Sequence, residues 1–360
     1  MRIVSTLDKG LDVLEAIESS GRPLTVAEIA ESTGIQRTAV FRLLATLENR
    51  GYVERLPNKR YRCTSRRRRF LIGYCAPQSG SPFRDDVAAG IRDAAERANV
   101  ELMALDNRED DADRAAANAQ RLIDAKADLV MLFQPAEWVC HTVADQFFHA
   151  GIPVISIDVP AAGCVYFGGN NYRAGRLAGQ VLARFARETW KGKFDKVVLL
   201  ESTLASTNVQ ARLGGVLIGL KETLDGVDES KVVHLSTRAD TATSREAMSA
   251  FLAQTRKGTQ LLVAGFNDRA AVGAVWAARV AGREKDIAVV GQNATEEART
   301  EIRHPDSRLI ASIAYFPERY GEKLVRLALA MMSRERVPPA VYVEHMVLDH
   351  NNIDRIYARR

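Results

Sequence analysis

The stretch GRPLTVAEIAESTGIQRTAVFRLLATLENRGYVERLPNKRYR, residues 21–62, contains two helical patterns separated by a glycine turn. Thr25 followed three residues later by Glu28 is the pattern of a capping box, which predicts that a helix begins there. Gly34 lacks a Cβ and therefore suits the tight turn after this helix. A longer helix is expected over about 36–50, and two short strands follow it. This order predicts a helix-turn-helix with a two-stranded wing.

One face of the 36–50 helix is suited to contact DNA. Its buried stripe is expected to contain the apolar residues Val40, Leu43, Leu44 and Leu47. The opposite face, toward the N-terminal end, carries Gln36, Arg37, Thr38, Phe41 and Arg42. Amide and guanidinium groups can form paired hydrogen bonds with purine edges, and an aromatic ring or a threonine methyl can pack on thymine methyls. The other interpretation is a winged helix that contacts only proteins, with these charges solvated.

The positive charge of the chain is concentrated in its first segment. Residues 1–69 contain fourteen Lys and Arg against eight Asp and Glu, a net charge of +6, whereas the whole chain of 360 residues carries +5. The remaining residues therefore sum to −1. An excess of positive charge on the segment predicted to contact DNA is what binding to phosphates requires.

Residues 5–63 resemble the N-terminal winged helix of the IclR-type transcriptional regulators. The stretches that carry this resemblance are LDVLEAI, PLTVAEIAESTGI, RLLATLENRGYVER and RYR. The residues that the resemblance places on the recognition helix are Arg37, Thr38, Phe41 and Arg42. It also implies that Lys59 and Arg60, at the tip of the wing, contact backbone phosphates.

The resemblance ends at the stretch TSRRRR, residues 64–69. Four consecutive arginines repel one another and do not form a buried element. Two interpretations stay open: a basic strap that binds phosphates or enters the minor groove, and a solvated connector. The chain does not continue into the effector domain that follows the wing in IclR-type proteins.

From Phe70 onward, apolar runs of strand length alternate with helical patterns. The expected strands are FLIGYCAP at 70–77, ELMALD at 101–106, DLVMLF at 128–133, IPVISID at 152–158, KVVLLE at 196–201, KVVHLS at 231–236, LLVAGF at 261–266 and DIAVVG at 286–291. Apolar runs of this length separated by helices indicate parallel strands covered on both faces. The second part is therefore predicted to be an α/β domain with doubly wound parallel sheets.

Polar and aromatic residues, among them Gln134 and Asp158, follow the ends of these strands. Ligands of such sheets bind at the carboxyl ends of the strands. The set contains no glycine-rich phosphate loop and no nucleophile elbow. Planar hydrogen-bonding groups combined with aromatic rings suit a neutral polyhydroxylated ligand.

Residues 70–356 resemble the periplasmic-binding-protein fold, specifically the sugar-binding branch shared with LacI/GalR-type repressors. The stretches that carry the resemblance are SPF at 81–83, IPVISID at 152–158, GNNYRAGRLAG at 169–179, ARLGG at 211–215, FNDRAAVGAV at 266–275 and DIAVVGQN at 286–293. By analogy with ribose-type binding proteins, the ligand-facing residues are Ser81, Phe83, Arg84, Asp158, Gln210, Asn267, Asn293 and Tyr315. Gln134 joins this set from its place after a strand.

Several positions depart from the ribose-type pattern, so ribose itself is not the expected ligand. Val159 stands where an arginine is usual, and another usual arginine falls at or near Gln210. Asn293 replaces a carboxylate, and Tyr315 replaces a glutamine. A second interpretation gives Arg84 an acidic sugar or a sugar phosphate as its partner.

The resemblance implies two lobes and three crossings between them, near Tyr172, near Tyr315–Phe316 and near Glu344. Lobe one is expected at about 70–172 and 316–344, and lobe two at about 173–315 and 345–356, after a winged helix at 1–63 and a linker at 64–69. Asn170 and Asp268 are expected to cap helices rather than to contact ligand.

Composition argues against several other classes of protein. Four cysteines form no CxxC pair and have no His at metal-ligand spacing, so free thiols and no metal or cofactor are expected. No signal-peptide pattern is present, and no apolar run approaches the roughly 20 residues of a membrane span. The six histidines are scattered and suit surface or loop positions, so no enzyme activity is expected. The chain is predicted to be cytoplasmic, without a membrane partner.

These features together predict a sugar-responsive transcription regulator, a repressor of carbohydrate uptake or catabolism genes. Ligand-driven closure of the two lobes would change its affinity for operator DNA. A homodimer or a tetramer is expected, because one winged helix contacts too few bases for high specificity. The alternatives are a solute-binding protein of a sugar transporter, and a regulator that senses a sugar acid, a polyol or a sugar phosphate.

Overall fold

The computed structural model describes residues 4–64, 70–78, 81–109, 111–202, 207–238 and 240–358. Contacts divide the chain into two compact units, Met1–Phe70 and Leu71–Arg360. The four arginines of the predicted basic linker lie outside the described residues.

The first unit contains three helices and a three-stranded antiparallel sheet. Its elements are α1 (Ser5–Ser19), β1 (Leu24–Thr25), α2 (Val26–Thr33), α3 (Arg37–Asn49), β2 (Val53–Arg55) and β3 (Arg60–Cys63). The strand order is β1-β3-β2, so the short β1 adds a strand to the predicted wing. Val13, Ile29, Val40, Leu44 and Tyr61 form the core on which these elements pack.

The predicted start of α2 and the turn after it are confirmed. The Thr25 hydroxyl accepts a hydrogen bond from the Glu28 amide at 3.3 Å, and the Glu28 carboxylate accepts one from the Thr25 amide at 2.6 Å. Gly34 ends the helix at φ +69°, in the left-handed region that favours glycine. Local sequence therefore determines where the helix-turn-helix begins and where it turns.

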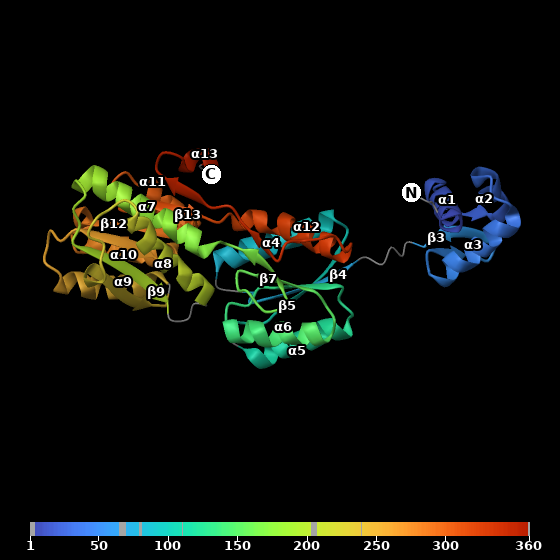
Figure 1. Ribbon diagram of the computed structural model, residues 1–360, viewed down its shortest axis with the longest axis horizontal. Coiled ribbons are helices and arrows are strands. Elements are labelled where there is room, and N and C mark those ends of the chain that lie inside the picture. The colour runs from blue at the N-terminus through green and yellow to red at the C-terminus, as the bar shows by residue number, and fades with distance from the viewer. Residues whose placement is uncertain are drawn as a thin grey trace. The chain divides into compact units, whose positions relative to one another are not determined.

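The second unit consists of two lobes, each a sheet with helices on both faces (Figure 1). Lobe one contains β4 (Leu71–Ala76), α4 (Pro82–Arg97), β5 (Glu101–Asp106), α5 (Ala112–Asp124), β6 (Leu129–Leu132), α6 (Glu137–His149), β7 (Val154–Ile157), β8 (Val165–Gly168), η3 (Pro317–Arg319), α12 (Tyr320–Met332) and β14 (Ala340–Tyr342). Its sheet is parallel throughout, in the order β14-β8-β7-β6-β4-β5.

Lobe two is built in the same way. It contains α7 (Asn171–Trp190), β9 (Lys196–Ser202), α8 (Thr207–Lys221), η1 (Glu229–Lys231), β10 (Val232–Thr237), α9 (Thr241–Gln254), β11 (Leu261–Gly265), α10 (Asp268–Val280), η2 (Glu284–Asp286), β12 (Ile287–Asn293), α11 (Glu296–Arg303), β13 (Leu309–Ala314), β15 (Met346–Asp349) and α13 (Ile353–Ile356). The strand order is β10-β9-β11-β12-β13-β15, and β15 alone in this sheet pairs antiparallel.

Alternating residues of each central strand bury on opposite faces of its sheet. In β9, Val197 and Leu199 pack toward α7 and α8, while Val198 and Leu200 pack toward α9 and α10. A strand covered on both faces must be apolar at every position, which is why these strands appear as continuous apolar runs. The predicted α/β fold with two doubly wound sheets is confirmed.

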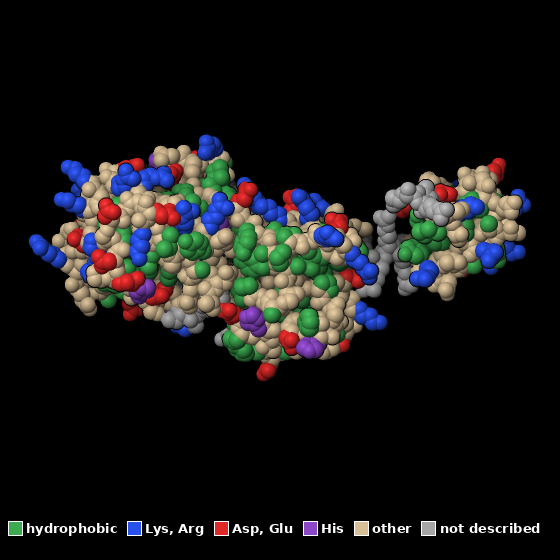
Figure 2. All heavy atoms as spheres, viewed as in Figure 1, with side chains coloured by type: hydrophobic (Ala, Val, Ile, Leu, Met, Phe, Trp, Pro, Cys, Tyr) green, Lys and Arg blue, Asp and Glu red, His purple; other side chains and the backbone are tan. Residues whose placement is uncertain are grey.

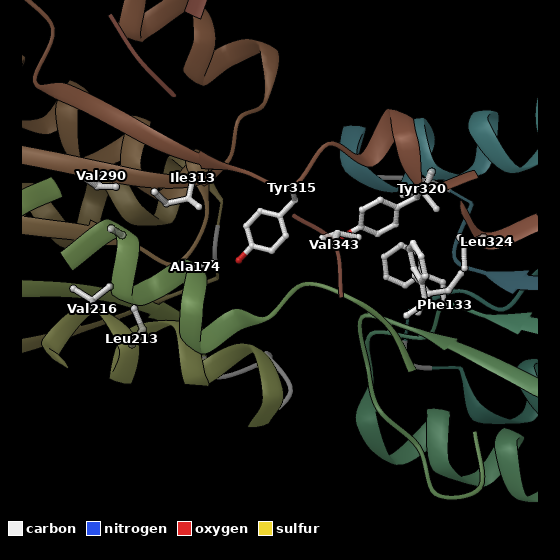
Figure 3. Close-up of a cluster of buried hydrophobic side chains, with 14 of the residues drawn as sticks. Phe133, Ala174, Leu213, Val216, Val290, Ile313, Tyr315, Tyr320, Leu324 and Val343 are labelled. Carbon is white, nitrogen blue, oxygen red and sulfur yellow. The ribbon is translucent and has the colours of Figure 1, made fainter. Parts of the chain in front are cut away.

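The chain passes between the lobes at 169–170, at 315–316 and at 343–345. Figure 3 shows Tyr315 between the lobes, with Ile313 of one sheet on one side and Tyr320 of the other lobe on the other. Phe316 takes φ +58°, which turns the chain from β13 into η3. Side chains from both lobes therefore meet around these crossings.

Among the described helices, none combines the length and the apolar character that crossing a bilayer requires.

Candidate functional site

The N-terminal half of α3 presents an exposed polar face. All five residues predicted to face DNA on this helix are exposed: Gln36, Arg37, Thr38, Phe41 and Arg42. The Phe41 ring is 53% exposed although Val40 and Leu44, on the other face, are fully buried. Figure 2 shows Lys and Arg side chains spread over the visible surface of this unit. An exposed aromatic ring between cationic and amide groups is available to contact a groove.

Arg60 flanks the turn of the wing, and its side chain is directed toward α2. Its guanidinium donates hydrogen bonds to the Pro23 carbonyl at 2.9 Å and to Glu28 Oε2 at 3.1 Å, which fastens β3 to α2. Hydrogen bonds from Thr25 and from Arg22 lower the pKa of Glu28 to about 2, so Glu28 stays ionised and holds Arg60. Lys59, at φ +60° in the turn of the wing, is exposed. Of the two predicted wing cations, Lys59 is exposed and the Arg60 side chain is 35% exposed.

In the second unit, Asp158 follows β7 and faces the other lobe. It takes φ +59°, and its Oδ1 accepts hydrogen bonds from the Gly169 amide at 3.1 Å and from the Tyr320 hydroxyl at 3.5 Å. Burial raises the pKa of Asp158 to about 6. A Cβ at Gly168 would overlap Asp158 Oδ1, so only glycine leaves room for this carboxylate.

Arg212, on α8 of lobe two, is the cation opposite Asp158. Its Nε donates to Asn171 Oδ1 at 2.6 Å and its Nη1 donates to the Phe266 carbonyl at 3.2 Å. The guanidinium carbon lies 4.7 Å from the ring centroid of Tyr315. Both hydrogen-bond acceptors are neutral carbonyl oxygens. The positive charge of Arg212 opposes the rise in the pKa of Asp158.

The first turn of α8 joins the two lobes directly. Asn208 Nδ2 donates to the Asp158 carbonyl at 3.2 Å and to the Tyr166 hydroxyl at 3.4 Å. Thr207 donates to Glu137 Oε2 through its amide at 3.0 Å and its hydroxyl at 2.9 Å. In this arrangement the lobes are therefore in hydrogen-bonding contact.

Tyr315 lies between the lobes, at the crossing of the chain at 315–316 (Figure 3). The side chain is 1% exposed, and its hydroxyl lies 3.3 Å from Asn171 Oδ1 and 3.2 Å from Gln292 Oε1. Burial raises the pKa of Tyr315 to about 12, so the hydroxyl stays protonated and donates to one of these oxygens. The phenol is thus committed to neighbouring protein groups as well as to the stack with Arg212.

His345, expected on the surface or in a loop, packs edge-on against Tyr315 with ring centroids 4.4 Å apart. Its Nε2 accepts a hydrogen bond from the Asn170 amide at 3.0 Å. Burial lowers the pKa of His345 to about 4, so the ring is neutral at physiological pH. Asn170 caps α7 as predicted, since its Oδ1 accepts from the Arg173 amide at 2.9 Å.

Four predicted ligand residues come from lobe one after β4 and β6. Ser81 precedes α4, and the Phe83 ring packs edge-on against Tyr320 at a centroid distance of 5.6 Å. Arg84 forms an ion pair with Glu109. Gln134 is fully buried: its Nε2 donates to the Glu109 carbonyl at 2.6 Å, and its Oε1 has no hydrogen-bond partner within the described part of the chain.

The remaining predicted residues come from lobe two. Gln210 is exposed on α8, and Asn293 ends β12 at φ +107°. Asn267 caps α10 by accepting from the Ala270 amide at 2.9 Å.

The prediction that Asp268 caps a helix is wrong, because Asn267 takes that place. Asp268 is fully buried and accepts hydrogen bonds from the Ser312 hydroxyl and from the Thr295 amide, both at 2.6 Å. Burial raises the pKa of Asp268 to about 7.

A cleft of about 760 Å³ lies between the lobes. It is lined by Pro82, Phe83, Asp86, Asn293, Ala294, Thr295, Glu296, Arg299, Thr300, Arg303, Pro317, Glu318, Ile356, Tyr357 and Ala358. Of the predicted ligand residues, this cavity is bordered by Phe83 and Asn293, from opposite lobes. Asp158, Arg212 and Tyr315 lie outside its lining.

Sequence reasoning did not single out Arg212, Asn208 or Tyr166. A signal existed for Arg212, which stands two residues after Gln210, near where the resemblance placed an arginine. Tyr166 lies on β8, a strand of four residues that the apolar pattern did not reveal. Asn208 and Tyr166 are brought together only by the approach of the two lobes.

Comparison with protein families gives two matches. A model described as the IclR helix-turn-helix domain matches residues 6–57, and one described as a periplasmic binding protein domain matches residues 72–336. The second description is periplasmic binding protein and not LacI/GalR. Neither description is that of an enzyme family.

The similar curated proteins bind sugars according to their names. The D-ribose/D-allose-binding protein of Pseudomonas aeruginosa is 26% identical over 200 residues, which are 53% of this chain and 59% of that relative. The chain therefore spans less than two thirds of this relative. The ribose import binding protein RbsB of Escherichia coli is 25% identical over 267 residues, 71% of this chain and 83% of that protein.

Two solved structures share the fold of the second unit. An ABC transporter periplasmic solute binding protein from Actinobacillus succinogenes, with bound D-allose, has a TM-score of 0.67 at 19% identity and is covered to 99% by 79% of this chain. An ABC transporter solute binding protein from Bacillus halodurans, with bound myo-inositol, has a TM-score of 0.68 at 17% identity. The match covers 97% of that chain and 80% of this one.

Proposed function

The chain belongs to the periplasmic binding protein domain family and carries an IclR helix-turn-helix domain joined to it; from this premise we propose that it is a sugar-responsive DNA-binding transcription regulator. The observation that carries the proposal is the union of these two units in one chain. A solute-binding protein of a transporter has no use for a DNA-contacting helix, and a simple DNA-binding protein has no use for a two-lobed cleft.

The winged helix contacts operator DNA through α3. Arg37 and Arg42, with Gln36, read base edges, while the Phe41 ring packs on thymine methyls. Thr38 lies on the same face. Lys59 binds backbone phosphate from the wing, whereas Arg60 acts indirectly by fastening the wing to α2. The net charge of +6 over residues 1–69 supports this assignment.

The ligand binds between the lobes, where Asp158 and Arg212 face each other. Both hydrogen bonds to the Asp158 carboxylate end on Oδ1, so Oδ2 is the acceptor for ligand hydroxyls. Arg212 and Asn208 supply donors from lobe two, and the Phe83 ring supplies an apolar face for the C–H groups of a sugar. Ser81, Arg84, Gln134, Gln210, Asn267, Asn293 and Tyr315 complete the proposed surroundings.

The proposed ligand class is a neutral sugar or polyol. Relatives named for D-ribose and D-allose, and solved structures with bound D-allose and myo-inositol, support this class. The guanidinium of Arg212 favours a second candidate, a sugar acid whose carboxylate would pair with it.

Ligand binding controls DNA binding through the spacing of the lobes. The ligand favours the arrangement in which both lobes contact it, and a homodimer transmits the change to two winged helices on a pseudo-palindromic operator. A coupling of about 1–3 kcal/mol between ligand binding and DNA binding, typical of allosteric proteins, is sufficient to change operator affinity. We propose that the protein acts in this way as a repressor in the cytoplasm.

A thermal-shift screen of the full chain tests the ligand class directly. Ligand at about a hundred times its Kd stabilises the native state by about 2.7 kcal/mol. The panel is D-ribose, D-allose, myo-inositol, allitol, D-gluconate and D-ribose 5-phosphate. We expect a neutral sugar or polyol of this panel to raise the Tm of the wild type and to leave the Tm of Asp158→Asn unchanged. A shift with D-gluconate alone selects the sugar-acid candidate, and no shift with any member contradicts the proposed class.

A further inference from the structure

The C-terminal segment after β15 is fastened to lobe two. Ile353 of α13 is 1% exposed and belongs to the core of this lobe. From α11, Arg303 donates to Asp354 Oδ1 at 2.7 Å through Nε and to the Tyr357 carbonyl at 2.6 Å through Nη2. The backbone of Tyr357 therefore moves with lobe two.

The side chain of Tyr357 extends to the other lobe. Its hydroxyl donates a hydrogen bond to Glu318 Oε1 at 3.0 Å. Glu318 lies on η3, which follows the crossing at 315–316 and packs on α4 of lobe one. The Tyr357 ring also stacks on Phe316, with ring centroids 6.2 Å apart and planes inclined by 16°. One side chain thus joins lobe two to the crossing and to lobe one.

Two guanidinium groups extend this contact into a row. Arg299 of α11 lies 4.1 Å from the Tyr357 ring centroid, and Arg319 of η3 lies 4.3 Å from that of Phe316. Arginines over aromatic faces attract the ring quadrupole, and stacked rings add their own attraction. The row Arg299–Tyr357–Phe316–Arg319, the aromatic row, begins on lobe two and ends on lobe one.

The aromatic row borders the interlobe cleft. Arg299, Glu318 and Tyr357 line the same cavity as Phe83 and Asn293, the proposed ligand residues of opposite lobes. A motion that separates η3 from the C-terminal segment must break the hydrogen bond of Tyr357 with Glu318, whereas the contacts with Arg303 lie within lobe two and persist.

We propose that Tyr357 is an affinity-determining residue, and that the C-terminal segment is a strap that holds the two lobes together around the ligand. The arrangement that contains the aromatic row also contains the bonds of Asn208 to Asp158 and of Thr207 to Glu137. The strap therefore favours the lobe contact in which the proposed ligand groups converge. Ligand affinity rises with the population of this arrangement. The inference rests on the proposed ligand-binding function.

Calorimetric titration of the full chain with D-allose and with D-ribose tests the strap. Removing one hydrogen bond to a carboxylate in Tyr357→Phe is expected to weaken binding about threefold to tenfold. Tyr357→Ala, which also loses the stack, is expected to weaken it more than about tenfold. Tyr357→Phe combined with Glu318→Gln is expected to be no weaker than Tyr357→Phe alone, because both remove the same bond.

The matched control is Tyr52→Phe, which removes an exposed phenol hydroxyl from the first unit and is expected to leave affinity unchanged. Wild-type affinity in Tyr357→Ala, or tighter binding, overturns the strap. Hydrogen exchange measured without ligand tests, independently of sugar binding, whether Tyr357 holds the two lobes together. Tyr357→Ala is expected to speed exchange at 315–320, where the Arg319 amide bonds the Phe316 carbonyl.

Faster exchange confined to 350–358 would show that Tyr357 holds only the tail, and this result also overturns the strap. If no neutral sugar or polyol of the thermal-shift panel binds the wild type, the proposed ligand class fails. The exchange experiment then still decides on the strap, so the two failures are distinguishable.

Discussion

The winged helix and the two-lobed unit present their candidate residues in opposite ways. On α3 the candidate side chains are exposed, with Phe41 at 53%. Between the lobes, Arg212 stacks on Tyr315 and both bond Asn171, while Asp158 accepts hydrogen bonds from Gly169 and Tyr320. Exposed side chains can change without a cost in folding, whereas a buried network couples ligand binding to stability and to pH. Substitutions in the two units should therefore have separable effects.

The largest effect is expected from Asp158→Asn. Asparagine tolerates the left-handed φ of Asp158 and keeps an oxygen for the Gly169 amide, but it loses the charged acceptor for ligand hydroxyls. We expect more than about a hundredfold loss of affinity for the sugar that stabilises the wild type, measured by calorimetry.

Stability should not fall in this variant. Because folding raises the pKa of Asp158 to about 6, the carboxylate that is ionised at pH 7 costs folding free energy, and the neutral asparagine avoids this cost. Urea unfolding at this pH checks this half of the prediction. A large loss of stability together with affinity would mean that Asp158 maintains the fold rather than the site.

His345→Gln should change how stability depends on pH. The pKa of His345 is about 4 in the folded chain and 6.5 in the unfolded chain, so acidification favours the unfolded state between these values. The glutamine side chain cannot bind a proton but can still accept from the Asn170 amide. The variant should therefore lose less stability, by about 2 kcal/mol, when urea unfolding is compared at about pH 7.5 and about pH 5.

Tyr315 packs against this ring, and the charges of Arg212 and Arg173 help to lower the pKa of His345. Their effect on His345 is therefore part of the difference that the comparison measures. An equal loss of stability on acidification in the wild type and in the variant would show that His345 is not the source of the pH dependence.

Arg42→Ala tests the exposed side of the comparison. Loss of a paired guanidinium contact is expected to weaken operator binding about tenfold per half-site and to leave ligand affinity unchanged. Fluorescence anisotropy with a duplex selected from a random-sequence pool measures the effect, and Lys9→Ala on α1 is the control. Equal losses of DNA affinity and ligand affinity would contradict the prediction that substitutions in the two units have separable effects.

The smallest effect is expected from Thr25→Ala, which removes the capping hydroxyl of α2. A lost N-cap costs about 1 kcal/mol, so amides of α2 should exchange about fivefold faster. Thr46→Ala is the matched control, because its hydroxyl bonds the Arg42 carbonyl within α3 and caps no helix. Unchanged exchange in Thr25→Ala would mean that packing alone holds α2.

The elements predicted well are those whose cause is local. Thr25 with Glu28 marks the start of α2, Gly34 its end, and the continuous apolar run of β9 reflects burial on both faces. Of the strands that escaped prediction, β13 has six residues and lies inside its sheet, whereas the others are short: β1 has two residues, β14 has three, and β8 and β15 have four. Strands of this length carry too few residues for a periodic signal.

The candidate site was predicted in part, because its positions after strands are readable but its pairings are not. The sequence contains Arg212, yet only the meeting of α8 with the crossings reveals that it stacks on Tyr315. The hydrogen bond of Arg60 to Glu28 spans 32 positions, and no local pattern in the sequence indicates it. The hydrogen bond between Tyr357 and Glu318 joins residues 39 positions apart, and it too is visible only in the folded structure.

The central claim is that a ligand in the two-lobed unit controls DNA binding by the winged helix. The direct measurement is operator affinity by fluorescence anisotropy, without and with a saturating sugar whose binding calorimetry has established. We expect the sugar to change the affinity of the wild type by about 5- to 150-fold, and Asp158→Asn to bind DNA normally without responding. An unchanged affinity in the wild type with sugar bound would contradict the account.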